Sequence, residues 1–77
     1  MNKPLYVHAD WDAEAGVWVA TSNDVPGLAT EALTVEALVT KLETLIPDLL
    51  EANGATPDQG TAFELPARRF DHILPAA

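Results

Sequence analysis

The chain has 77 residues, 48 % of them hydrophobic, with no cysteine and a formal net charge of −8. This length suits a single domain spanning residues 1–77, and the hydrophobic fraction is too high for a disordered chain. The absence of cysteine excludes disulfides, thiolate metal sites and cysteine catalysis. Because small secreted domains usually depend on disulfides, we expect a cytoplasmic protein without a signal peptide. No segment approaches the roughly 18 apolar residues of a membrane-spanning helix, so we expect no membrane association.

The acidic residues are concentrated in the middle of the chain. Between Asp10 and Glu64 the sequence has eleven acids and one base, Lys41. Nucleic-acid binding requires several Lys or Arg contacts to phosphates, so this distribution argues against direct binding of nucleic acid. The same charge would steer a basic protein toward the domain. The alternative is that the charge only keeps the domain in solution.

The first 22 residues predict a β-hairpin. Apolar and polar residues alternate from Leu5 to Trp11, a Gly-containing loop spans residues 12–16, and β-formers fill Val17 to Ser22. A symmetric five-residue loop predicts that Trp11 faces Val17. One face of the hairpin would then carry Tyr6, His8, Asp10, Trp18, Ala20 and Ser22. A shift of one residue in the loop would turn the second strand over.

A turn and a helix follow the hairpin. Pro26-Gly27 favours a tight turn before a short strand over Leu28–Ala32. Thr34 is the predicted N-cap of an amphipathic helix that ends at Asn53-Gly54. Pro47 lies inside this segment, but the helical spacing of the apolar residues continues on both sides of it. We therefore expect one kinked or locally irregular helix. The apolar stripe of this helix comprises Val35, Leu38, Val39, Leu42, Leu45, Ile46, Leu49 and Leu50.

The last predicted element is a strand over Phe63–Ile73, where Pro66 favours an edge position or a bulge. The order β-β-β-α-β predicts an α+β fold, in which a three-strand antiparallel meander is covered on one face by the single helix. No second helix is available for the other face. We therefore expect that face to bind protein, through Tyr6, His8, Trp18 and Ala20, and we expect a homo-oligomer, a dimer or higher.

The residues that could carry out catalysis form no convincing site. Asp10, Glu36 and Asp71 lie on elements where a metal-dependent nuclease would place carboxylates, but twelve acids in 77 residues produce such a pattern by chance. His8 and His72 match no metal-binding spacing. Ser22 lacks the Gly-x-Ser-x-Gly context, and Arg68-Arg69 are too few for nucleic acid. We therefore expect no enzyme, no catalytic or metal-binding residue and no cofactor.

Three segments carry a resemblance to a known family: Asp12–Ala20, Asp24–Glu31 and Leu33–Leu38. With their aromatic-Val-Ala strand, Pro-Gly corner and Thr-x-Glu-Ala helix start, they resemble HicB-type antitoxin domains. The short stand-alone members of that family, catalogued as a domain of unknown function, are the most similar. The resemblance covers about Leu5 to Gly54, and it implies a partial RNase-H-like sheet.

The resemblance also implies a role in a type II toxin–antitoxin pair, in which the acidic domain masks a small basic toxin that cleaves messenger RNA. Longer members of that family carry a DNA-binding domain after the last strand, which we do not expect here. Three functions thus stay open: a HicB-like antitoxin, a structural oligomeric module without a toxin, and, more remotely, a metal-dependent nuclease.

Overall fold

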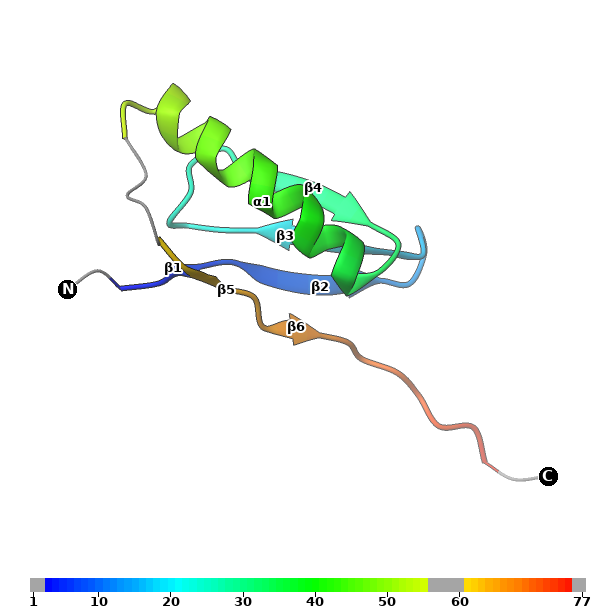
Figure 1. Cartoon of the computed structure of the whole chain (residues 1–77). Coiled ribbons are helices and arrows are strands. Elements are labelled where there is room, and N and C mark those ends of the chain that lie inside the picture. Colours follow the sequence, from blue (N-terminus) through cyan, green and yellow to red (C-terminus); the bar gives the residue numbers. More distant parts are fainter. Residues whose placement is uncertain (1–2, 56–60, 76–77) are drawn as a thin grey trace.

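The computed structural model describes residues 3–55 and 61–75, which form a sheet of short strands with one helix packed on it (Figure 1). Within these residues no helix is long and apolar enough to cross a bilayer. The elements in chain order are β1 (Leu5–Tyr6), β2 (His8–Asp12), β3 (Val17–Thr21), β4 (Ala29–Ala32), α1 (Val35–Ala52), β5 (Phe63–Glu64) and β6 (Ala67–Arg68). The predicted α+β fold, with an antiparallel meander, one helix and a C-terminal strand segment, is confirmed.

The sheet has the strand order β4-β3-β2-β6, and β1 pairs with β5 beside it. β2, β3 and β4 are antiparallel neighbours, whereas β6 runs parallel to β2 and β5 runs parallel to β1. Leu5 pairs with Phe63 and Ala9 with Ala67, so one register joins both parallel pairs.

Pro66 explains why the C-terminal segment is divided into two short strands. Proline has no N–H to donate to a neighbouring strand, although its carbonyl can still accept. The Pro66 carbonyl accepts from the Ala9 N–H at 2.9 Å, and the Glu64 carbonyl accepts from the Val7 N–H at 3.0 Å. The predicted edge position of this proline is confirmed, but the predicted strand to Ile73 is too long, because pairing ends at Arg68.

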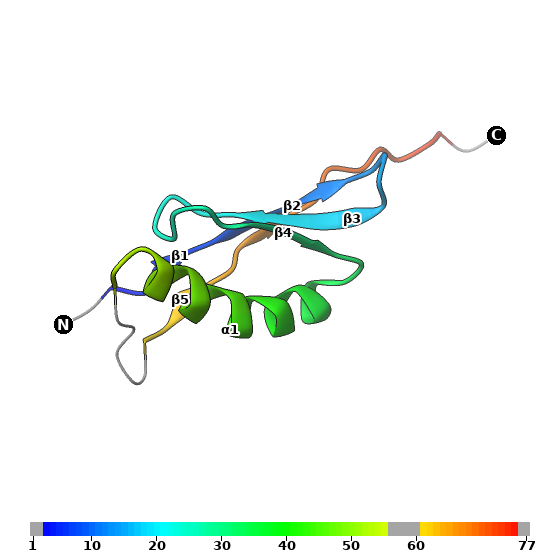
Figure 2. The same ribbon diagram turned by 90° about the horizontal axis from the view of Figure 1, so that it is seen from above.

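The core lies between the sheet and α1, which crosses one face only (Figure 2). Alternation along the strands sends every second side chain to this face. The helix contributes its stripe at a spacing of about one turn. The buried residues are Val7, Ala9, Ala20, Val25, Leu28, Ala32, Leu38, Leu42 and Ile46.

Both ends of α1 are closed by local hydrogen bonds. The Thr34 hydroxyl accepts from the Ala37 N–H at 3.0 Å, which confirms the predicted N-cap. At the other end the chain reverses at Gly54, whose φ is +81°. The Gly54 N–H donates to the Glu51 carbonyl and the Ala55 N–H to the Leu50 carbonyl. This is a Schellman motif, which confirms the predicted stop at Asn53-Gly54.

Pro47 lies inside α1, which is continuous from Val35 to Ala52. A proline at this position removes the bond that would reach the carbonyl of Glu43, four residues earlier. The neighbours Leu42 and Ile46 are buried in the core. Tertiary packing therefore retains the helix across the proline, and the prediction of one helix, not two, is confirmed.

The turn between β3 and β4 ties the sheet to the helix. The Leu28 N–H donates to the Val25 carbonyl at 3.1 Å, and Gly27 has a φ of +83°, as expected for a turn with Pro at its second position and Gly at its third. The Asn53 amide donates to the Pro26 carbonyl at 3.3 Å. The Pro-Gly corner thus positions the end of α1 against the sheet.

Candidate protein-binding face

The sheet face opposite α1 begins with Tyr6, His8 and Asp10. Val7 and Ala9, which alternate with them, are fully buried under the helix. Tyr6 is 48 % exposed, and the side chains of His8 and Asp10 are 42 % and 60 % exposed. The predicted position of Tyr6 and His8 on the uncovered face is therefore confirmed.

The hairpin register differs from the predicted one by one residue. Trp11 pairs with Trp18, Ala9 pairs with Ala20, and Asp12 pairs with Val17. Trp18 and Ala20 thus share the helix-covered face with Ala9, and Ala20 is fully buried. Their predicted position on the face of Tyr6 and His8 is wrong.

The cause of this shift is Asp12, which belongs to both the strand and the turn. Its Oδ1 accepts from the Glu14 and Ala15 N–H groups at 3.1 Å each, and its carbonyl accepts from the Gly16 N–H at 2.7 Å. Gly16 takes a φ of +70°, which its lack of a Cβ permits. The loop therefore needs only four residues, and the second strand turns over.

The side chains on the uncovered sheet face are here called the open face. The register places Val17, Val19 and Thr21 on it in place of Trp18 and Ala20. Glu31 joins it as the partner of Val19 on β4. The same registers add Asp12, Ala29 and Arg68, which pair with Val17, Thr21 and Asp10. The open face thus comprises Tyr6, His8, Asp10, Asp12, Val17, Val19, Thr21, Ala29, Glu31 and Arg68. A signal for this assignment was present in the sequence, since an Asp followed by a turn ending in Gly favours a side-chain-capped turn.

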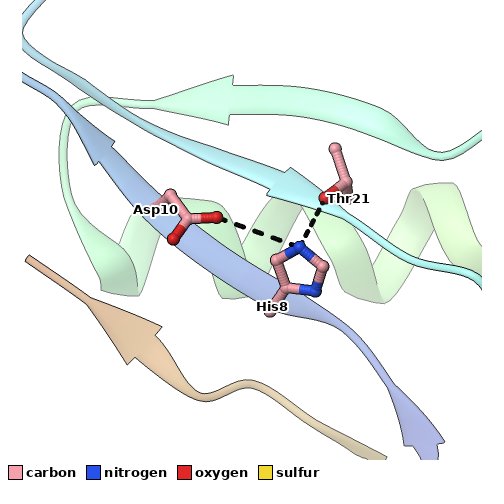
Figure 3. A network of polar contacts seen from close by, with 3 residues as sticks. All are labelled: His8, Asp10 and Thr21. Carbon is pink, nitrogen blue, oxygen red and sulfur yellow. Dashed lines mark hydrogen bonds and ion pairs between the residues drawn. The ribbon is translucent and has the colours of Figure 1, made fainter.

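A polar network links β2 and β3 on the open face (Figure 3). His8 Nε2 and the Thr21 hydroxyl lie 2.9 Å apart and share a hydrogen bond. His8 Nε2 also lies 3.8 Å from Asp10 Oδ2. The Tyr6 and His8 rings are tilted neighbours with centroids 6.0 Å apart. These groups offer hydrogen bonds and an aromatic surface to a ligand, which are interactions typical of protein interfaces.

The edge of the open face is bounded by the parallel segment β5–β6. In the parallel register of β2 and β6, Arg68 lies beside Asp10 on the neighbouring strand. A shallow hollow of about 440 Å³ lies here, lined by Tyr6, His8, Ala9, Asp10, Pro66, Ala67 and Arg68. It is a depression between neighbouring strands, and its lining mixes aromatic, acidic and basic groups.

The backbone of Tyr6 is held by the loop after β3. The Tyr6 N–H donates to Asp24 Oδ2 at 2.7 Å, and the Ser22 hydroxyl donates to the Tyr6 carbonyl. The Ser22 hydroxyl also accepts from the N–H groups of Asp24 and Val25, at 3.0 and 3.2 Å. Ser22 therefore has a structural role, because its hydroxyl replaces ladder hydrogen bonds at the end of the hairpin.

The structure does not bring together the three carboxylates of the nuclease hypothesis. Asp10 is on β2, Glu36 is in the first turn of α1, and Asp71 lies beyond β6, where its Oδ2 accepts from Arg69 Nε at 2.7 Å. Among residues 3–55 and 61–75, no three His, Cys, Asp or Glu side chains are placed to hold a metal ion. His72 also lies beyond β6, where its ring packs edge-on against Phe70.

Comparison with known proteins gives the family. The model of a family described as a domain of unknown function, DUF1902, matches residues 4–74. The chain belongs to this family. A crystal structure of hypothetical protein TTHA1013, from the extremely thermophilic bacterium Thermus thermophilus, is similar at 49 % sequence identity and a TM-score of 0.72. The match covers 94 % of this chain and 99 % of that one. No curated protein matches the chain.

The DUF1902 assignment agrees with the predicted membership of a domain family of unknown function. The match from residue 4 to residue 74 includes β5, β6 and the residues after them, whereas the resemblance in the sequence ended near Gly54. Family membership alone does not assign an activity to a DUF1902 domain. Its function must therefore be argued from the open face and from the surface charge.

Proposed function

We propose that this DUF1902 domain is a non-catalytic protein-interaction domain, which acts as the antitoxin of a type II toxin–antitoxin pair by masking a small basic toxin that cleaves RNA. The observation that carries the proposal is the open face. It combines an aromatic ring, two β-branched apolar side chains and carboxylates, and no element of residues 3–55 or 61–75 packs over it. An uncovered sheet face of this composition is suited to a protein partner.

The surface charge supports a basic partner. All eleven Asp and Glu residues that the structure describes are exposed. Among them only Asp71 forms an ion pair with an Arg or Lys, whereas Asp10 lies near His8. The acids around the open face are therefore available to a partner, and a basic protein is the class whose association they accelerate.

The likeness to HicB-type antitoxin domains supports the choice of an RNA-cleaving toxin as that partner. The segments that carry it are the hairpin, the Pro26-Gly27 corner and the helix start at Thr34. Each of them has a structural role in the fold described above, so the likeness bears first on architecture. The proposal of a toxin partner therefore rests on this likeness together with the acidic charge, because such toxins are small and basic.

The proposal is tested by co-expressing the domain with any short basic protein encoded beside it. We expect the two to co-purify and the domain to relieve the growth arrest caused by the neighbour. Val19→Lys should abolish both effects, because it places a positive charge in the middle of the open face. Leu33→Lys is the matched control: it makes the same charge change at an apolar residue that is 73 % exposed and precedes the N-cap of α1.

Circular dichroism of both variants establishes that the fold is retained. A lone domain with no complex and no relief of growth would exclude the toxin partner. A complex that survives Val19→Lys as well as it survives Leu33→Lys would exclude the open face as the binding surface.

A further inference from the structure

The chain beyond β6 leaves the body of the domain. Residues Arg69–Leu74, here called the C-terminal arm, extend away from the sheet and helix in both views (Figures 1 and 2). Phe70, Ile73 and Leu74 in this arm are 75 %, 97 % and 84 % exposed. Three large apolar side chains within five residues are an unusual concentration for a surface segment, and such clusters mark interaction sites.

The arm has the side-chain alternation of a β-strand. The rings of Phe70 and His72 lie 5.8 Å apart on one side, and Arg69 Nε lies 2.7 Å from Asp71 Oδ2 on the other. Contacts between residues two apart are typical of extended backbone. Within the described chain, however, the arm makes no backbone hydrogen bond. It is therefore an extended segment with its own backbone groups free to pair.

The first residue of the arm is held against the hairpin. The Arg69 guanidinium carbon lies 4.2 Å from the centroid of the Trp11 ring, which indicates a cation–π contact. This contact fixes where the arm leaves the sheet. The arm continues the line of β6, whose only neighbour among the described strands is β2. The outer edge of β6 and the arm together form one unpaired edge, which can accept another strand.

The charge of this segment favours a second copy of the same chain. Elsewhere two copies repel each other, because the chain has 12 acids and 4 bases. Residues 68–74 hold two of those bases, Arg68 and Arg69, and one acid, Asp71. This edge is thus a described region that lacks the net negative charge of the rest of the chain, so two acidic domains can approach each other here with less repulsion. In an antiparallel pair about a twofold axis, each copy contributes this same edge. No unpaired copy of the edge is left in the dimer, so the assembly stops at two chains.

We propose that two copies of this chain dimerise through antiparallel pairing of their C-terminal arms, with Phe70 on the twofold axis. In this register Arg69 lies opposite Asp71 of the second copy, so opposite charges meet on one face of the ribbon. The two Phe70 rings meet on the other face, and Pro66 and Leu74 lie opposite each other further along. Ile73 lies opposite Ala67 of the second copy. The pairing therefore gives each of the three exposed apolar side chains an apolar neighbour on the second copy.

This dimer does not require the proposed function. The arm projects from the far edge of the sheet, beyond β6, whereas the open face is centred on β2 and β3. A dimer built through the arms leaves the open face accessible on each copy. Binding of a basic partner and dimerisation are consequently separable by mutation.

Sedimentation equilibrium of the full chain over a wide concentration range tests the proposal. We expect a reversible dimer, and we expect Phe70→Asp to raise its dissociation constant at least about ten-fold, because the variant replaces an aromatic contact with two facing carboxylates. Leu33→Asp is the control, since Leu33 is 73 % exposed, close to the 75 % of Phe70, but precedes the N-cap of α1, outside the arm. A wild-type monomer at every concentration, or equal effects of the two variants, would overturn the proposal.

The register is tested by single cysteines, since the chain has none of its own. Phe70→Cys places two thiols directly opposite each other on the twofold axis, within reach of a disulfide after a small adjustment. We expect mild oxidation to link this variant rapidly into a covalent dimer and to leave Leu33→Cys largely monomeric. Equal cross-linking of both variants would indicate random collision and would contradict the pairing. An arm that folds back onto its own domain would give no cross-link, with the same conclusion.

Discussion

At the scale of single residues, Ala20 marks the side of β3 that faces the helix. Ala9 and Ala20 lie directly opposite each other beneath α1, and both are fully buried. Small side chains at this point allow the helix to approach the sheet closely. Val19, one residue away, faces the other side with Thr21 and is only partly buried. A larger side chain should therefore be tolerated at Val19 but not at Ala20, although both residues are apolar neighbours on one strand.

We therefore expect Ala20→Leu to lower the free energy of unfolding by about 1–3 kcal/mol, because added methyl groups must displace the close-packed core. Val19→Leu should change it by only about 0.5 kcal/mol, because the open face has room for the side chain. Urea denaturation of the two variants measures the difference. A larger loss for Val19→Leu would indicate the register with the opposite face inward.

At the scale of elements, α1 is retained by tertiary packing despite its internal proline. Its N-cap, its Schellman motif and its buried residues at positions 38, 42 and 46 all favour the helix, whereas Pro47 opposes it. Pro26 occupies the opposite kind of position. It stands at the second residue of a turn, where a fixed φ near −65° is an advantage.

The same replacement at the two prolines should consequently change stability in opposite directions. Pro47→Ala should raise the free energy of unfolding by up to about 3 kcal/mol, since alanine restores a helical N–H and a better propensity. Pro26→Ala should lower it by about 0.4–1 kcal/mol through the greater entropy of the unfolded chain. Thermal and chemical denaturation of both variants provide the comparison. A loss of stability in Pro47→Ala would mean that the proline ring makes packing contacts that outweigh the missing bond.

At the scale of the whole molecule, the dominant property is unbalanced negative charge on a small fold. The formal net charge is −8, every acid that the structure describes is exposed, and only one of these acids pairs with an arginine. Repulsion among these groups disfavours the compact state, and dissolved salt screens it over a Debye length of about 10 Å at 0.1 M. The charge that we propose attracts a basic partner therefore lowers the stability of the free domain.

We expect the thermal midpoint of the free domain to rise as sodium chloride is increased from low salt to about 0.5 M, because screening weakens the repulsion. A variant combining Glu14→Gln, Glu43→Gln and Glu51→Gln, at three exposed positions, should show a smaller rise. Scanning calorimetry of both proteins over the same salt series provides the measurement. An equal rise in both would attribute the effect to general salt action on the hydrophobic core and not to charge.

The sequence alone was sufficient for the features that depend on near neighbours. The N-cap at Thr34, the stop at Asn53-Gly54 and the Pro-Gly turn each involve a few residues whose side chains or φ preferences specify the geometry. The α+β meander followed from apolar periodicity, which changes from two to about 3.6 residues between the strands and the helix. Tyr6 and His8 were placed correctly because alternation along one strand needs no partner.

The tertiary structure alone decided the features that depend on pairing between distant residues. The capping preference of Asp12 favours the four-residue loop, but the packing of Ala20 and Trp18 beneath α1 fixes it. This register places Val17, Val19 and Thr21 on the open face. The end of the last strand at Arg68 likewise follows from the length of its parallel partner, not from residues 69–73 themselves. The uncovered sheet face is predictable from the sequence, whereas its exact residues and the unpaired arm depend on which strands pair and in which register.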